Sequence, residues 1–190
     1  YQHFPLYSTW AGFFNAASLQ IPPIMFAALF SPALAGLYAL AHRALAMPMS
    51  VIGRAVGDVF FSSASEAHRN GELPPLVSRI HEKLAQIAMP PMLILVIVGP
   101  ELFTLVFGAS WRAAGVFAQW LAPWLYLVFI PSPLSTLFSV MEKQKQGAVF
   151  QAVLLVTRIG AIVLGAMTGS VLKTIILFSL VSAICWLGLL

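Results

Sequence analysis

Charged residues and cysteines are scarce in this 190-residue chain. Only 8% of its residues are charged, whereas a soluble domain carries about 25%. Because hydrophobic residues make up 60% of the chain, we interpret it as an integral membrane protein. Cys185 is the one cysteine, which excludes an internal disulfide framework and any metal site built from several cysteines.

Motifs typical of enzymes are also missing. The sequence contains no pair of carboxylates on one helical face, no clustered histidine ligands, no G-x-S-x-G turn and no glycine-rich phosphate loop. Its ten basic residues are scattered, which disfavours a nucleic-acid partner. We therefore expect no enzyme, no cofactor and no metal. The chain begins at Tyr1 without a basic leader, so we expect a fragment with no signal peptide.

Long apolar stretches predict six transmembrane helices, because a hydrocarbon core of about 30 Å needs roughly 20 helical residues. The expected spans are about 8–30, 35–61, 84–98, 116–141, 148–167 and 174–190. The fold class expected is therefore an all-α membrane protein.

A polar region at about 62–83 separates the second and third spans. Asn70-Gly71 is typical of a helix end, and Pro74-Pro75 is typical of a new helix start. Apolar residues then recur at helical spacing, which predicts a short amphipathic helix on the membrane surface. The alternative is that this segment is the solvated end of a long helix. Gly99-Pro100 is expected to close the third span.

Basic residues indicate the orientation. The loops after the second and fourth spans hold five of them, Arg69, Arg79, Lys83, Lys143 and Lys145. The loops on the other side hold Arg112 and Lys173. Because cytoplasmic loops carry the excess of Lys and Arg, the first group is predicted to be cytoplasmic.

Prolines interrupt several spans. Pro22 and Pro23 lie inside the first span and Pro48 lies inside the second. Each removes a backbone donor and favours a kink or break. Bent helices of this kind are typical of transporters that expose a central site to alternating sides of the membrane.

The second span carries a polar stripe. Arg43 and Arg54 are eleven residues apart, which is three helical turns, and Asp58 follows Arg54 by four. Charge inside the bilayer is costly, so such residues usually face protein or water. For Arg54 we favour an ion pair with Asp58 or contact with cytoplasmic headgroups, in a structural or gating role.

Further polar residues lie inside other spans. Arg158 is near the middle of the fifth span, Gln151 shares its face, and Asn15 lies inside the first span. If Arg43 and Arg158 share a cavity with these amides, its positive charge favours an anionic group such as phosphate. The alternative is that the two arginines pair with acids outside this chain. For His42 we favour packing or hydrogen bonding, and for Trp120, Trp124 and Tyr126 we favour helix packing over stacking on sugar rings.

Three segments resemble polysaccharide flippases of the Wzx type, which belong to the MOP exporter superfamily with the MATE drug exporters. They are residues 36–73, which begin GLYALAHRALAMP, residues 102–115, LFTLVFGASWRAAG, and residues 121–144, LAPWLYLVFIPSPLSTLFSVMEKQ. Together they extend over much of the chain.

The resemblance implies a MATE-like fold of 12 or more helices in two lobes, of which residues 1–190 form the C-terminal lobe and the N-terminal lobe is absent. It implies transport of an undecaprenyl-pyrophosphate-linked oligosaccharide across the bacterial inner membrane by a multi-pass protein. Arg43, in the A-x-R-x-L context, and Arg158 match the family's cavity arginines. Partners implied are this lipid-linked substrate, membrane lipids, the missing lobe, a polysaccharide polymerase and a chain-length regulator.

Two other functions remain open. A multidrug exporter coupled to cations needs carboxylates inside its spans, and only Asp58 qualifies here. A non-transporting scaffold of a polysaccharide synthesis complex needs no internal site at all.

Overall fold

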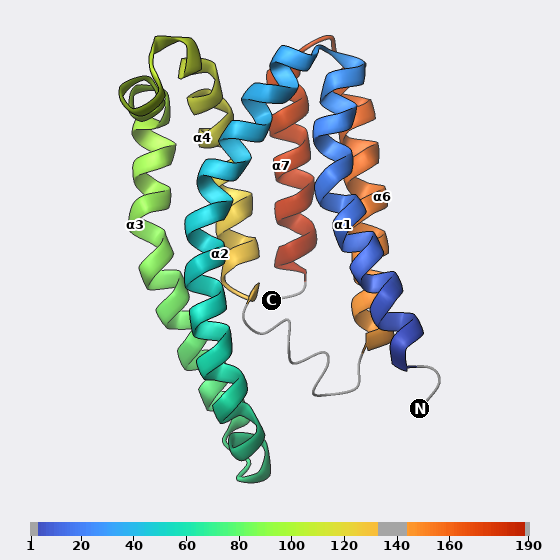
Figure 1. Ribbon diagram of the computed structural model, residues 1–190, viewed down its shortest axis with the longest axis vertical. Coiled ribbons are helices and arrows are strands. Elements are labelled where there is room, and N and C mark those ends of the chain that lie inside the picture. Colours follow the sequence, from blue (N-terminus) through green and yellow to red (C-terminus); the bar gives the residue numbers. More distant parts are fainter. Residues whose placement is uncertain (1–3, 133–143, 189–190) are drawn as a thin grey trace.

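The computed structural model describes residues 4–132 and 144–188, and these ranges contain helices and no strands (Figure 1). The helices are α1 (Phe4–Leu29), α2 (Pro32–Arg69), α3 (Leu73–Phe107), the 3-10 turn η1 (Ala109–Trp111), α4 (Arg112–Phe129), α6 (Gln144–Ala166) and α7 (Val171–Leu187). Every expected span corresponds to one of the six α-helices, which confirms the all-α class. The end of the expected fourth span, 133–141, and Lys143 lie outside the described residues.

By length and composition, three of the described helices could cross a membrane. They are α1 over Gly12–Leu29, α3 over Leu73–Phe107 and α6 over Gln146–Ala166. Helix α7 is apolar but shorter. The long α2 carries Arg43, Arg54 and Asp58, which lower its mean hydropathy. Six crossings therefore stay a prediction, whereas a membrane protein with several apolar helices is what the structure supports.

Residues at the two ends of α2 explain where this helix begins and where the chain turns after it. Ser31 precedes α2, and its Oγ accepts a hydrogen bond from the Leu34 amide at 3.2 Å. Pro32 begins the same helix, where its missing N–H costs nothing. The turn between α2 and α3 uses Gly71 at a φ of 73°, a left-handed conformation that glycine adopts without strain.

One expected helix boundary is wrong and another is confirmed. The amphipathic segment after Pro75 is no separate surface helix, because it is the solvated beginning of the 35-residue α3. At Gly99-Pro100 the expected interruption is present, because α3 consists of two helical segments that meet at a kink there. Val98 leaves helical geometry, with φ −121° and ψ 23°, and α3 then continues in a new direction to Phe107 (Figure 1). A proline inside a helix produces such a kink because it removes a hydrogen bond and its ring displaces the preceding turn.

The other prolines leave their helices intact. Helix α1 is a single helix across Pro22 and Pro23, and α2 is a single helix across Pro48. The expected break at Pro22-Pro23 is therefore not present. The direction of α2 does change along its length (Figure 1). Bending at these prolines during transport stays a prediction.

Five helices form a closed ring, in which α1 contacts α6, α6 contacts α7, α7 contacts α4, α4 contacts α2 and α2 contacts α1. Helix α3 lies outside this ring and packs mainly on α4. Helix α4 is the most central, and Ala118, Leu121 and Ala122 on it have no exposed surface. The turn between α2 and α3 lies at one end of the bundle, and the connections from α1 to α2, α3 to α4 and α6 to α7 lie at the other (Figure 1).

Candidate functional site

The polar stripe of α2 faces away from the helical core. Arg43, Met47, Ser50, Arg54 and Asp58 are all exposed, and Met47 is exposed to 67%. Their spacing of three and four residues places them along one face of the helix, as the sequence predicts. The bundle therefore leaves this face uncovered, and a charged face is available to a ligand, to water or to another part of the protein.

The two charges near the lower end of the stripe do not pair. Arg54 and Asp58 form no ion pair in the structure, although their spacing of four residues favours one. The one ion pair among the described residues joins Arg112 Nη2 to Glu101 Oε1 at 2.8 Å. A gating role for Arg54 and Asp58 stays a prediction.

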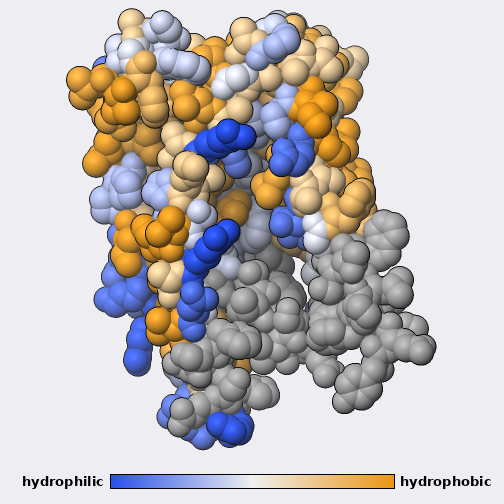
Figure 2. Space-filling model, in the orientation of Figure 1, coloured by the Kyte–Doolittle hydropathy of each residue, from blue (hydrophilic) through white to orange (hydrophobic). Residues whose placement is uncertain are grey.

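A hollow lies beside the stripe. Figure 2 shows hydrophilic side chains of α2 and α1 on the two sides of a depression between these helices. On α1, Asn15 and Gln20 are exposed. Exposed guanidinium groups on α2 and exposed amides on α1 can donate hydrogen bonds to an anion and to hydroxyl groups.

Arg158 occupies a different environment inside the ring. It is 5% exposed, and its guanidinium donates hydrogen bonds to groups on two other helices. Nη1 bonds to the Oγ of Ser18 on α1 and to the carbonyl of the same residue at 3.4 Å. Nε donates to the Oγ of Ser182 on α7 at 3.4 Å. Arg158 thus connects α1, α6 and α7.

Aromatic rings complete the surroundings of Arg158. Its guanidinium carbon lies 4.9 Å from the ring centroid of Trp124 and 6.0 Å from that of Phe178, within the range of cation–π attraction. His42 stacks on Trp124 at 5.8 Å and on Tyr38 at 6.0 Å. The expectation that His42 and Trp124 pack within the bundle is confirmed. No carboxylate of the described residues pairs with Arg158.

The structure does not bring all the predicted cavity residues together. Arg43 is exposed on the outside of α2, whereas Arg158 is buried between α1, α4 and α7. Gln151 is half-buried two turns before Arg158 on α6, and Asn15 lies one turn before Ser18 on α1. A substrate-binding role for these four residues stays a prediction, and Arg43 is the arginine whose position makes it accessible.

Helical spacing and local composition do not predict that Ser18 and Ser182 accept hydrogen bonds from Arg158. Ser18 is 140 residues away in sequence and lies in an apolar stretch that suggests only a membrane helix. The one available signal is that a buried guanidinium needs acceptors, and small hydroxyl residues on neighbouring helices are the usual source where carboxylates are few.

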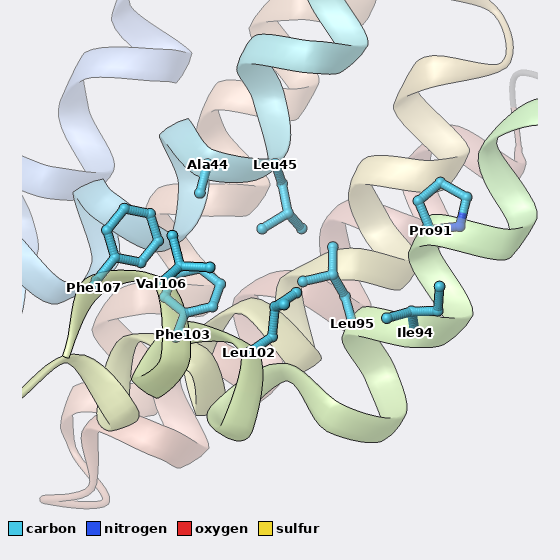
Figure 3. Close-up of a pocket in the computed structure, with 9 residues that line it drawn as sticks. All are labelled: Ala44, Leu45, Pro91, Ile94, Leu95, Leu102, Phe103, Val106 and Phe107. Atoms are coloured by element: carbon cyan, nitrogen blue, oxygen red, sulfur yellow. The ribbon is translucent and has the colours of Figure 1, made fainter. Parts of the chain in front are cut away.

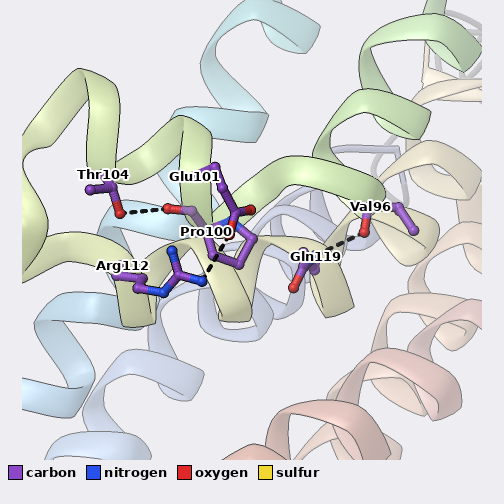
Figure 4. Close-up of polar contacts among 6 residues, drawn as sticks. All are labelled: Val96, Pro100, Glu101, Thr104, Arg112 and Gln119. Atoms are coloured by element: carbon purple, nitrogen blue, oxygen red, sulfur yellow. Dashed lines mark hydrogen bonds and ion pairs between the residues drawn. The ribbon is translucent and has the colours of Figure 1, made fainter.

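A second polar cluster stabilises the kink in α3 (Figure 4). Pro100 has no N–H, so the carbonyl of Val96 four residues earlier loses its helical partner. The Nε2 of Gln119 on α4 donates to that carbonyl at 2.8 Å. Thr104 Oγ1 donates to the Pro100 carbonyl at 2.7 Å, and the pair of Arg112 with Glu101 lies just beyond it.

Two glycines allow the kink to pack tightly. A Cβ at Gly115 of α4 would lie 2.5 Å from the Cα of Pro100, and a Cβ at Gly99 would lie 2.9 Å from the Gly115 carbonyl oxygen. The two backbones are therefore in direct contact, which only glycine permits. The sequence predicts the interruption at Gly99-Pro100, but it does not predict which residues of α4 pack against it.

Among residues 4–132 and 144–188, no three His, Cys, Asp or Glu side chains are close enough together to hold a metal ion.

Comparison with protein families gives one match. The family model described as "polysaccharide biosynthesis protein" matches residues 1–115, which include α1, α2, α3 and the polar stripe. Neither the curated proteins nor the solved structures include a match to the chain.

Proposed function

The chain belongs to the polysaccharide biosynthesis protein family, and from this premise we propose that it moves a lipid-linked oligosaccharide across the membrane. The substrate is an oligosaccharide linked to undecaprenyl pyrophosphate, and the membrane is the bacterial inner membrane. The chain contributes one lobe of a longer transporter that exposes its site to one side and then to the other.

The position of Arg43 carries this proposal. Arg43 lies on an apolar helix bundle, is exposed, and forms no ion pair with any residue that the structure describes. An arginine on a membrane helix costs roughly 3 kcal/mol on insertion scales, so it faces protein, water or a ligand. A guanidinium binds phosphate oxygens through two parallel hydrogen bonds, which suits a pyrophosphate headgroup. Asn15 is exposed on α1, so its amide can bond to sugar hydroxyl groups.

Arg43→Ala and Arg43→Lys in the full-length gene test the proposal. We expect the alanine variant to lose at least about tenfold in polysaccharide output, because charged hydrogen bonds contribute about 1.5–3 kcal/mol. The lysine variant keeps the charge and loses the two-pronged geometry, so it should retain part of the output. The measurements are surface polysaccharide, lipid-linked precursor in the inner leaflet, and protein level.

Arg112→Ala is the matched control. Arg112 is equally an exposed arginine, but it pairs with Glu101 at the far end of α3 and lies outside the stripe. We expect normal polysaccharide from this variant. Normal output from Arg43→Ala at normal protein level would refute the headgroup site.

Two other functions make different predictions. A scaffold of the synthesis complex predicts that output falls with complex assembly while transport in reconstituted vesicles is unchanged. A drug exporter predicts that Asp58→Asn abolishes drug resistance and that Arg43→Ala leaves the polysaccharide unchanged.

A further inference from the structure

An apolar trough runs between α2 and α3. Its larger part is a cavity of about 320 Å³, and nine hydrocarbon side chains line it (Figure 3). A smaller cavity of about 100 Å³ continues it along the same two helices. The two parts share Ala44 and Leu45 of α2 with Pro91 and Leu95 of α3. The two cavities are therefore neighbours along the seam between α2 and α3, and we call them together the trough.

The kink in α3 produces this trough. Helix α3 packs on α4 and contacts α2 only sparsely, so a gap remains along the α2/α3 seam. After Val98 the helix turns, and Leu102 and Phe103 beyond the kink lie opposite Leu95 before it (Figure 3). Gln119 and the contact of Gly99 with Gly115 stabilise this geometry from the other side of α3.

The trough is open to its surroundings and suits a linear molecule. Ile94 is 51% exposed, Val106 is 61% exposed and Phe107 is 43% exposed, so its rim is not covered by the bundle. From Ile87 to Leu95 alone it extends about 12 Å along α3, at about 1.5 Å per residue. A space that is long, narrow and lined by hydrocarbon offers no partner to a polar group and fits an extended chain.

The trough adjoins the polar stripe. Ala44 lines both cavities, and Arg43 precedes it in the chain. Consecutive helical residues point about 100° apart, so the charged face and the apolar face of α2 lie side by side. A ligand that fits both faces has an anionic head and a long hydrocarbon tail.

We propose that the trough between α2 and α3 binds the hydrocarbon tail of the lipid-linked substrate while the headgroup lies at Arg43. The inference rests on the proposed function and assigns a second part of the substrate to a second surface. Tail binding contributes packing rather than a hydrophobic gain, because lipid tails are as apolar as the trough. Its role is to hold the chain beside the site of the headgroup.

Photo-crosslinking of the full-length protein in lipid nanodiscs tests the proposal. One probe is a polyprenyl diphosphate with a diazirine and an alkyne on its hydrocarbon chain. The other is phosphatidylglycerol with the same diazirine on an acyl chain. We expect the polyprenyl probe to label peptides of the α2/α3 trough, and unlabelled polyprenyl diphosphate to abolish this labelling. The phosphatidylglycerol probe should be insensitive to that competitor.

Matched variants locate the site. Val106→Trp places a large ring on the rim of the trough, whereas Leu105→Trp places it on a neighbouring residue that is 83% exposed and does not line the trough. We expect Val106→Trp to lose most of the polyprenyl labelling and Leu105→Trp to retain it. Ala44→Leu fills the floor of the trough, and Ala33→Leu is its exposed control on α2. A stability measurement on each variant separates blocked binding from unfolding.

Each result has one meaning. Equal labelling by both probes, unaffected by Val106→Trp, would overturn the proposal in favour of ordinary membrane lipid. If the polyprenyl probe labels other helices and not α2 or α3, the proposal is overturned as well. The tail would then bind elsewhere, and another segment of the full chain would cover the trough. If the trough is labelled but Arg43→Ala exports normally, the tail site stands and the headgroup site fails. If Arg43→Ala abolishes export and the trough is unlabelled, only the tail site fails.

Discussion

The contact of α3 with α4 makes Gly115 the most sensitive glycine of the described chain. A Cβ at this position would lie 2.5 Å from the Cα of Pro100 and 2.6 Å from the carbonyl oxygen of Gly99, whereas ordinary contacts begin at 3.4 Å. Both neighbours are backbone atoms, so no side chain can move aside. Gly115→Ala therefore requires the two helices to separate by about 1 Å.

The expected cost follows from two opposing effects. Overpacking of this kind costs about 1–3 kcal/mol, and a contact between rigid backbones belongs at the upper end. Alanine is better than glycine in a helix by about 1 kcal/mol, which offsets part of the cost. We expect a net destabilisation of about 2 kcal/mol. The destabilisation is larger if separation of the helices also lengthens the hydrogen bond from Gln119 to the Val96 carbonyl.

Gly160→Ala is the control, because a Cβ there meets nothing within 4 Å. Gly160 is half-buried, and this helical change should stabilise the protein by roughly 0.5–1 kcal/mol, so the two variants should change the free energy of unfolding in opposite directions. The assay is equilibrium unfolding of the full-length protein in mixed detergent micelles with increasing dodecyl sulfate, followed by circular dichroism. A Gly115→Ala protein as stable as the wild type would refute the close backbone contact.

Two further predictions concern polar side chains that bond to another helix, and both use the same unfolding assay. Arg158→Ala should lower the free energy of unfolding by about 2–5 kcal/mol, because it leaves a cavity. Arg158→Met keeps the side-chain volume without the buried charge, so its free energy of unfolding should stay within about 1 kcal/mol of the wild-type value. We also expect Arg158→Met to keep polysaccharide export, and loss of export at normal stability would instead assign this residue to the substrate. Gln119→Leu should cost about 0.5–1.5 kcal/mol by leaving the Val96 carbonyl unpaired, while the exposed Gln86→Leu should change stability by less than about 0.5 kcal/mol. Equal stability of the two glutamine variants would contradict this account of the kink.

Features set by neighbouring residues could be predicted from the sequence. The apolar stretches predict the six helices, Asn70-Gly71 predicts the turn between α2 and α3, and the spacing of Arg43 and Arg54 predicts their common face. Each depends on backbone preferences or on helical periodicity within about ten residues. The exposure of that face also agrees with the cost of burying charge without a partner.

Features set by distant residues could not be predicted in this way. Gly99-Pro100 predicts the interruption of α3, but it does not predict that Gln119, on another helix, replaces the missing hydrogen bond of Val96. The same limit applies to Arg158, whose acceptor Ser18 is 140 residues away. A backbone carbonyl or a buried guanidinium indicates that a partner is needed, but the fold decides which residue supplies it.

The two arginines that the sequence places in one cavity have different surroundings, and the difference assigns them different tasks. The hydrogen-bond donors of Arg158 are directed at Ser18 and Ser182, and Trp124 lies against its guanidinium, so a headgroup reaching it has to displace protein contacts. Arg43 is exposed, has no such contacts with the described residues, and precedes Ala44, which lines the apolar trough. Binding energy for an anionic lipid is therefore available at Arg43 without reorganising the bundle, whereas Arg158 stabilises the ring that positions α2.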